Sequence, residues 1–273
     1  MISDANPVAF AQPLRRLIAI LGIWVLVAGV MRADALPWIL LNPANDTRDP
    51  EMQAWDQGDS RNFVEVANRS EAFAGTRFQW SQIALGDVLS ISTPFAELRF
   101  DAVKPMAFTT HEKATLQEWL TRGGFLLLFE DAYPYPQEVF RKNATLPVYE
   151  FFTRELPAKD PFFTVEHITD EHPIFHINHE TSTVPGIARE IRETPHYRGR
   201  TLILYHGRPV AFFMGRYNFE EDNRWVPRSR PFQTAYSSEL KSYYLIVNIY
   251  VYAMYAQDAP QPGAPPETTT TAR

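Results

Sequence analysis

The residues best suited to chemistry in this sequence lie in one short segment, Glu171-His172-Pro173-Ile174-Phe175-His176. If Pro173 begins a helical turn, the two histidines are four positions apart, face the same side and can share a metal ion. In the structural alternative, the histidines hydrogen-bond a loop while the apolar residues between them enter the core. The zinc protease signature H-E-x-x-H is absent, because the segment reads H-P-I-F-H. We favour the structural interpretation and keep His172 and His176 as candidate metal ligands.

A second group of candidate residues lies at predicted strand ends. Glu130 and Asp131 directly follow a continuous apolar run, and His111 follows a shorter one. Ligands of open parallel sheets bind outside the carboxyl ends of the strands, so these positions are where a site would form. In the structural alternative, Asp131 orders the turn that follows and Glu130 is solvated. The candidate pocket therefore comprises His111, Glu130, Asp131, His172 and His176.

Several classes of chemistry are excluded by residues that the sequence lacks. The 273 residues include no Cys, which excludes disulfides, a thiol nucleophile, Cys-ligated zinc and iron–sulfur clusters. The sequence contains neither G-x-G-x-x-G nor G-x-x-x-x-G-K-[ST] for phosphate, and no G-x-S-x-G elbow for a hydrolase serine. A net charge of -6 and the lack of a basic run argue against nucleic acid as a partner. We predict no cofactor.

The elements expected to position the candidate residues alternate between strands and helices. The pattern predicts a short buried strand over 105–109, a packed helix over 112–122 with Thr110 as N-cap and Gly123 as C′ residue, and a strand over 124–129 buried on both faces. Strand, helix and strand form a βαβ unit, so the two strands should be adjacent and parallel. The sequence thus predicts an α/β fold with a mostly parallel central sheet.

Further elements are predicted along the rest of the chain. Strands are expected over 78–83, 162–167, 200–205 and 209–214, with a hairpin turn at 206–208, and helices over 62–74, 135–155 and 237–255. Residues 168–198 are expected to form an irregular connection. Asn248, inside the last helix, is interpreted as a buried amide whose hydrogen bonds are satisfied.

The N-terminus has the organisation of an export signal. Arg15 and Arg16 precede the uncharged stretch 17–31, and Ala33-Asp34-Ala35 offers small residues at the positions that a signal peptidase reads. We predict export to the periplasm with cleavage after Ala35. The alternative is an uncleaved segment that anchors the protein to the inner membrane and is its only membrane contact. The predicted organisation is a signal peptide or anchor at 1–35, an extended arm at 36–60, an α/β domain at 61–256 and a disordered tail at 257–273.

Motifs along the chain resemble those of one bacterial family. They are Thr109-Thr110-His111, the stretch LTRGGFL at 120–126, Glu130-Asp131, the stretch DEHPIFH at 170–176, Gly207-Arg208 and Val247-Asn248-Ile249. Over roughly residues 60 to 255 the chain resembles the family called domain of unknown function 4159 (DUF4159). The resemblance implies a flavodoxin-like or class I glutamine-amidotransferase-like three-layer fold, and it implies neighbouring ATPases of the MoxR kind. Thr110 and Ile246 stand where the family usually has glycine, and the cysteine of an amidotransferase is absent.

Two hypotheses of function follow. The first is a non-enzymatic binding or assembly module of the cell envelope, because Cys and a phosphate loop are missing and because the resemblance implies envelope protein partners linked to a MoxR-type ATPase system. The second is a hydrolase, with or without a metal, whose His, Asp and Glu residues meet at the carboxyl ends of the strands. The second hypothesis requires the candidate pocket residues to converge on one cavity.

Overall fold

A computed structural model of the chain describes residues 35–46, 48, 50–69, 73, 76–101, 106–131, 147–181, 200–216 and 238–258. The predicted export signal at 1–35 lies outside these ranges except for its last residue, and the predicted tail lies outside them beyond residue 258. None of the helices in the described ranges combines the length and apolarity that a bilayer span requires.

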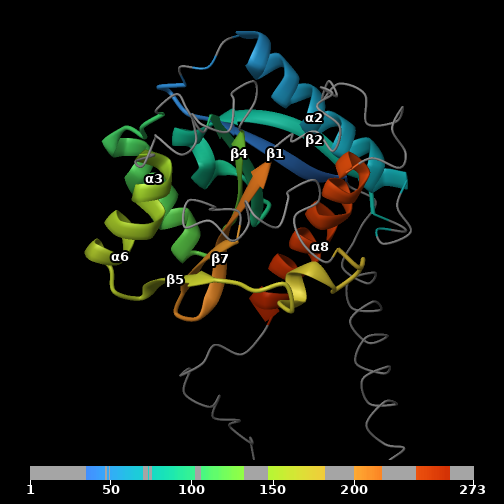
Figure 1. Cartoon of the computed structure of the whole chain (residues 1–273). Helices are drawn as coiled ribbons and strands as arrows, with labels where there is room; N and C mark the ends of the chain where they lie inside the picture. The colour runs from blue at the N-terminus through green and yellow to red at the C-terminus, as the bar shows by residue number, and fades with distance from the viewer. Residues whose placement is uncertain are drawn as a thin grey trace, which may run out of the picture.

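A seven-stranded mixed sheet forms the centre of the fold (Figure 1). The strands are β1 (Leu36–Asn42), β2 (Phe78–Ala84), β3 (Phe95–Asp101), β4 (Phe125–Asp131), β5 (Phe163–His167), β6 (Thr201–Tyr205) and β7 (Arg208–Arg216). Their order across the sheet is β2-β1-β3-β4-β7-β6-β5. The first five strands in that order are parallel to one another, and β6 and β5 extend the sheet by antiparallel pairing.

The order of the parallel strands identifies the fold class. Numbered along the chain, β1, β2, β3, β4 and β7 are arranged 2-1-3-4-5, which is the order of flavodoxin-like doubly wound sheets. The prediction of an α/β fold with a mostly parallel sheet is therefore confirmed, and the arrangement is consistent with a three-layer flavodoxin-like sandwich. The chain reverses its direction of travel across the sheet between β1 and β3, and this topological switch point is where such sheets bind ligands.

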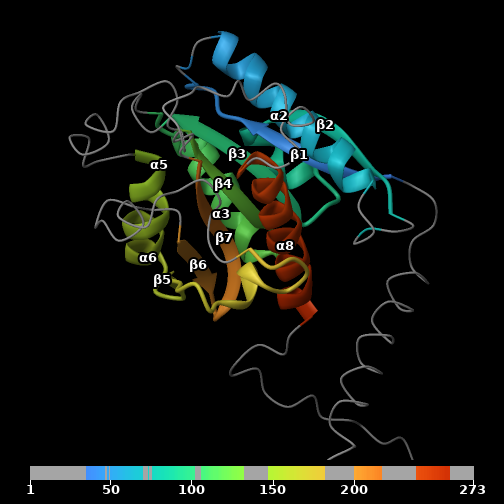
Figure 2. The ribbon, with the colours of Figure 1, turned by 45° about the vertical axis from the view of Figure 1, so that its right-hand side comes forward.

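Helices cover both faces of the sheet (Figure 2). The helical elements are α2 (Pro50–Arg69), the 3₁₀ helix η3 (Leu85–Ser90), α3 (Thr110–Thr121), α5 (Pro147–Glu150), the π-helical turn η4 (Phe151–Glu155), α6 (Leu156–Lys159), the 3₁₀ turn η5 (Pro173–Phe175) and α8 (Ser238–Asp258). One apolar cluster lies between the sheet and the helices on each face. One joins the sheet to α2, η5 and α8, and the other joins it to η3, α3, α5, η4 and α6. We call the two sides the α2/α8 face and the α3 face.

Strand β4 shows why its sequence has no apolar alternation. Phe125, Leu127 and Phe129 belong to the cluster on the α2/α8 face, whereas Leu126 and Leu128 belong to the cluster on the α3 face. Because helices cover both faces of this central strand, every position from 125 to 129 requires an apolar side chain. The predicted buried strand is confirmed.

The predicted strand at 105–109 is wrong. Residues 106–109 have no regular secondary structure and lead into α3, and the strand that precedes α3 and pairs in parallel with β4 is β3. Met106 and Phe108 are apolar because they pack in the cluster on the α3 face, not because they belong to the sheet. The βαβ unit is present, with its first strand ten residues earlier than predicted, at 95 instead of 105.

The predicted extended arm at 36–60 is also wrong. These residues form β1, which lies between β2 and β3, and the first half of α2. The prolines that suggested a loop occupy positions that tolerate them. Pro50 is the first residue of α2, where no helical hydrogen bond needs its N–H. Pro37 lies near the start of β1, and β3 pairs with β1 only from Ile39 onward.

Candidate functional site

Charged residues occupy the carboxyl ends of three adjacent parallel strands. In the register of the sheet, Asp101 of β3 lies beside Asp131 of β4, and Asp131 lies beside Arg216 of β7. Glu130, the other predicted acid, lies between Phe100 and Gly215. Both predicted acids are therefore at the carboxyl edge of the sheet, which is where open parallel sheets bind their ligands.

A buried pair of charged side chains lies on β3, just below this row. The side chains of Glu97 and Arg99 are 0 % and 1 % exposed, and Arg99 Nε lies 3.4 Å from Glu97 Oε1. Trp38 Nε1 donates a hydrogen bond of 2.8 Å to Glu97 Oε2. The Arg99 guanidinium lies 4.5 Å from the ring centre of Phe129, which gives it a cation–π contact. Buried charges persist only when paired and hydrogen-bonded, and these contacts meet that condition.

The sequence offered a signal for this pair that our sequence reasoning missed. The strand reads FAELRFD, so two opposite charges stand at alternate positions of an otherwise apolar run. Alternate positions share one face of a strand, and a salt bridge between them is a way to bury both.

At the topological switch point, the carboxylate of Glu112 binds two backbone N–H groups. Ala44, in the loop after β1, donates its N–H to Glu112 Oε1 at 2.7 Å, and Thr109 donates its N–H to Oε2 at 2.8 Å. Glu112 is 3 % exposed. Backbone N–H groups at a helix N-terminus are ordinary phosphate-binding groups, and here the N–H of the N-cap Thr109 already binds an internal carboxylate.

The loop after β1 is further fixed by a buried ion pair. Asp46 accepts two hydrogen bonds from Arg48 Nε, at 2.9 and 3.1 Å, and one of 2.6 Å from Nη2. The two side chains are 10 % and 4 % exposed. A bidentate contact of this kind restricts both side chains to one geometry. The switch-point loop is thus ordered by groups of its own.

His111 lies in the first turn of α3, on the α3 face. Its imidazole lies against η3, because a Cβ built on Gly86 would be 3.3 Å from His111 Cδ2. His111 is exposed. It does not directly follow a strand, because β3 ends at Asp101, and it packs beside the segment that follows β2.

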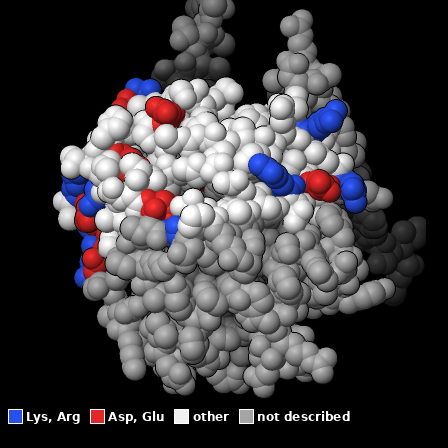
Figure 3. Space-filling model, turned by 90° about the horizontal axis from the view of Figure 1, so that it is seen from above, with Lys and Arg blue, Asp and Glu red and all other residues white. Residues whose placement is uncertain are grey.

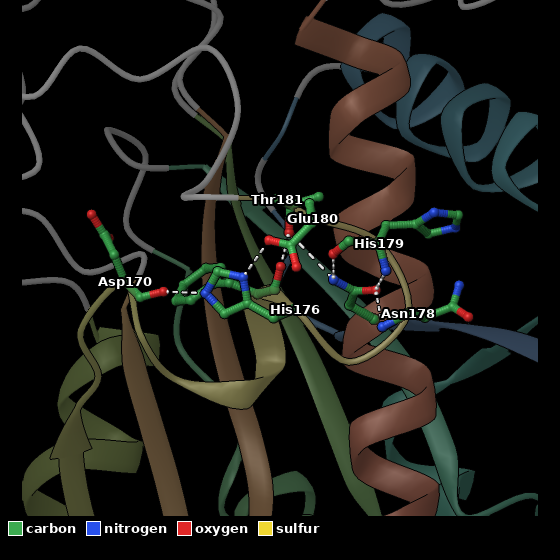
Figure 4. Close-up of polar contacts among 8 residues, drawn as sticks. Asp170, His176, Asn178, His179, Glu180 and Thr181 are labelled. Carbon is green, nitrogen blue, oxygen red and sulfur yellow. Dashed lines mark hydrogen bonds and ion pairs between the residues drawn. The ribbon is translucent and has the colours of Figure 1, made fainter. Parts of the chain in front are cut away.

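The helical turn predicted at Pro173 is confirmed, and it engages His172 as its N-cap. His172 Nδ1 accepts a hydrogen bond of 3.2 Å from the Ile174 N–H, and Nε2 lies 3.5 Å from the Tyr252 hydroxyl of α8. His176 follows the turn and has different partners. Its Nδ1 lies 2.8 Å from Glu180 Oε2, and its Nε2 lies 2.6 Å from the Asp170 carbonyl oxygen (Figure 4). Among the described residues, the two imidazoles have no hydrogen-bond partner in common.

These environments shift the pKa values of the two histidines in opposite directions. Burial lowers the pKa of His172, because the charged ring would lose its hydration. The hydrogen bond to Glu180, together with that to the Asp170 carbonyl, raises the pKa of His176. A shared metal ion would require a neutral nitrogen from each ring at one point, whereas the nitrogens of His176 are bonded to two other groups.

The sheet separates His111 from the other two histidines. His111 is on α3, whose apolar residues belong to the cluster of the α3 face, whereas Ile174 and Phe175, which flank His172 and His176, belong to the cluster of the α2/α8 face. Across the described parts of the chain, no three His, Asp or Glu side chains form a group that could hold a metal ion. The described histidines of the candidate pocket therefore do not converge.

Asn248 is a satisfied buried amide, as predicted. It is 0 % exposed, its Oδ1 accepts the N–H groups of Asn178 and His179, and its Nδ2 donates to the His179 carbonyl and to Thr181 Oγ1. Tyr244 and Tyr252 stand one turn to either side of it and contact His179 and His172. These three residues of α8 thus contact residues 172, 178, 179 and 181 of the segment that carries the histidines.

The described surface carries charges of both signs side by side. Seen from above, basic and acidic side chains are interspersed rather than gathered into a patch of one sign (Figure 3). Several are paired along helices, among them Glu65 with Arg69 and Glu118 with Arg122.

Comparison with models of known protein families finds no match, and comparison with curated proteins finds none either. The resemblance to domain of unknown function 4159 stays a prediction.

Proposed function

We propose that this chain is a non-enzymatic binding or assembly module of the cell envelope. The observation that supports the proposal best is the separation of the histidines. His111 is on the α3 face, and His172 and His176 on the other, where their nitrogens contact groups of the fold itself. A catalytic site needs its acid, base and nucleophile within hydrogen-bond reach of one substrate.

The binding surface we propose is the carboxyl edge of the parallel strands. It carries the row formed by Asp101, Asp131 and Arg216, and the loop after β1 lies along the same edge. Charges of both signs within one row favour a polar partner with complementary groups, such as the surface of a protein. The link of that partner to an ATPase system of the MoxR kind rests on the sequence resemblance alone.

A hydrolase is the second candidate, and one observation favours it. Asp101 and Asp131 are direct neighbours in register at the ends of two parallel strands. Aspartates at neighbouring strand ends are a common source of the general acid and general base that hydrolysis requires.

Site-specific crosslinking in the native host tests the two candidates together. A photoreactive residue replaces exposed Asn45, at the carboxyl edge, and in a matched control it replaces exposed His206, in the hairpin before β7. A binding module gives a specific crosslinked protein from position 45 but not from 206, and the adduct is lost in the Asp101→Asn/Asp131→Asn variant.

The same purified proteins are then assayed for release of products from envelope polymers and lipids, with and without divalent metal. Turnover by the wild type that disappears in Asp131→Asn, with no adduct from position 45, would favour the hydrolase and refute the binding module. Circular dichroism of each variant establishes that it is folded.

A further inference from the structure

The imidazole of His176 lies between two groups that can only accept hydrogen bonds. Nδ1 is 2.8 Å from the Glu180 carboxylate, and Nε2 is 2.6 Å from the carbonyl oxygen of Asp170. A neutral imidazole has a single N–H, whereas an imidazolium has two. Only the protonated ring can donate to both acceptors at these distances.

The two acceptors lie at the two ends of segment 170–180, so His176 joins these ends. At the first end, Asp170 forms an ion pair with Arg200, and the Ile168 N–H donates to the Arg200 carbonyl at 2.9 Å. At the other end, Thr181 donates its N–H to the Phe175 carbonyl at 2.8 Å and its hydroxyl to the same oxygen at 2.9 Å. The segment is therefore closed on itself, with the His176 ring as the bridge (Figure 4).

This closed segment covers part of the core on the α2/α8 face. Ile174 and Phe175 are 0 % exposed and pack in the same cluster as α8. The bridge is on the outer side, where the side chain of His176 is 34 % exposed and that of Glu180 is 84 % exposed. Solvent therefore reaches the contact between His176 and Glu180, whereas Ile174 and Phe175 stay buried.

We propose that segment 170–180 is a proton-controlled loop, closed while His176 carries both ring protons and loosened when the ring loses one. The bridge then keeps at most one of its two hydrogen bonds. The contacts of Asn248 with residues 178–181 and the ion pair of Asp170 with Arg200 remain, so the loosening is greatest between these two anchors.

The groups around His176 favour its charged form. Glu180 and Glu171, in its own segment, are negatively charged neighbours. From the start of β6, Arg200 faces the segment with its charge paired to Asp170. The described part of α8 contributes the uncharged Asn248 to the contacts with the segment, and its Tyr252 hydroxyl lies beside His172. The negative charge of Glu166 on β5 favours the protonated forms of both Tyr252 and His172.

The direction of the pH effect follows from the raised pKa of His176, whose first cause is the hydrogen bond to Glu180. The folded protein holds this proton more tightly than the unfolded chain does. The contribution of the bridge is therefore complete below 6.5, the ordinary value, and is lost as the pH rises through the raised pKa.

His172 and His179 act in the opposite sense on the same segment. Burial lowers the pKa of both rings, so their contribution is complete above 6.5 and is lost as the pH falls through the lowered values. We therefore expect the segment to be held best between the lowered pKa of His172 and His179 and the raised pKa of His176.

The test uses the full chain with ¹⁵N-labelled histidine. The ring nitrogens are followed by NMR from about pH 5 to about pH 9, and His176 is assigned by its loss in His176→Gln. Amide exchange of peptides covering 170–181, corrected for the intrinsic effect of pH, is measured in parallel. We expect His176 to hold two ring protons up to a pH above 6.5, and protection of 170–181 to fall roughly three- to tenfold as it deprotonates.

Variants separate the bridge from a general effect of alkali. In His176→Gln the alkaline loss of protection should vanish, because no proton is left to lose. In Glu180→Gln, a change at an exposed side chain, the midpoint for His176 should move down and the loss of protection should move with it. His111→Gln removes an exposed histidine on the α3 face and should behave as the wild type. A His176 ring that titrates at or below 6.5, or an alkaline loss of protection that persists in His176→Gln, would overturn the proposal.

Discussion

Asn248 binds both backbone polar groups of His179. Its Nδ2 donates to the His179 carbonyl at 2.8 Å, and its Oδ1 accepts the His179 N–H at 2.8 Å. The same side chain also accepts the Asn178 N–H and donates to Thr181 Oγ1. One residue of α8 therefore supplies hydrogen bonds to a stretch of chain that has no regular secondary structure. A side-chain amide is suited to this task because it has both a donor and an acceptor.

Replacing Asn248 by Leu, which has a similar size, should lower the free energy of unfolding by about 2–4 kcal/mol, because part-buried backbone groups of 178–179 lose their partners inside the fold. Urea denaturation measures the change. Asn62→Leu, the same chemical change on α2, should cost no more than about 0.5 kcal/mol. Equal effects of the two substitutions would contradict a stabilising role for the contacts of Asn248 with residues 178–181.

Gly124 gives a second prediction, because the Trp119 ring closes over it. A Cβ at this position would lie 2.3 Å from Trp119 Cδ2, and Trp119 is 5 % exposed in the core. Gly124→Ala should therefore destabilise the protein by about 1–3 kcal/mol, as overpacking does. Gly58→Ala is the matched control. It lies within α2 with nothing within 4 Å of the added methyl group, and should stabilise the protein by about 0.4–1 kcal/mol. Thermal unfolding monitored by circular dichroism should give opposite signs for the two substitutions.

The start of α3 gives a third prediction. Thr109 and Glu112 form a capping box, in which Thr109 Oγ1 accepts the Glu112 N–H at 3.2 Å. Thr109→Ala should cost about 1 kcal/mol of stability, whereas Thr110→Ala, at the neighbouring exposed position, should cost less than about 0.5 kcal/mol. Chemical denaturation of both variants compares them. The reverse order would mean that the N-cap is Thr110, as the sequence pattern had predicted.

The pair Glu97 and Arg99 gives a fourth prediction. Glu97→Leu leaves Trp38 Nε1 without its acceptor and a buried guanidinium without this carboxylate, so it should cost about 3–5 kcal/mol. Adding Arg99→Met should recover part of that loss, since an apolar pair often replaces a buried ion pair with little cost. A double-mutant cycle measures the coupling, and costs that simply add would refute it.

Export is the fifth prediction. The mature protein should begin at Leu36, which is also the first residue of β1, so cleavage after Ala35 leaves that strand whole. Mass spectrometry of the protein from its native host identifies the terminus. An intact Met1 in the membrane fraction would favour the anchor, and an intact Met1 in the cytoplasm would rule out export.

The amino-acid pattern was sufficient to predict those elements that depend on local structure or on complete burial. Strand β4 was predictable from its apolar run because a strand covered on both faces needs an apolar side chain at every position. The hairpin before β7 was predictable because its turn requires left-handed backbone, and His206 and Gly207 have φ of 51° and 78°. Gly123, with φ of +117°, ends α3 for a similar local reason.

The position of β3 and the separation of the candidate histidines depend on contacts between distant parts of the chain. The charges of Glu97 and Arg99 indicate an exposed strand until Trp38 and Phe129 supply their partners, and these contacts come from other strands. The spacing of His172 and His176 suggested a shared side, but the turn between them is 3₁₀, with three residues per turn, so positions four apart do not face one point. His111 is separated from them by the sheet, because α3 and the segment with the other two histidines pack on opposite faces. The face on which each segment packs depends on how the apolar surfaces of all elements are buried together, which neighbours in sequence do not reveal.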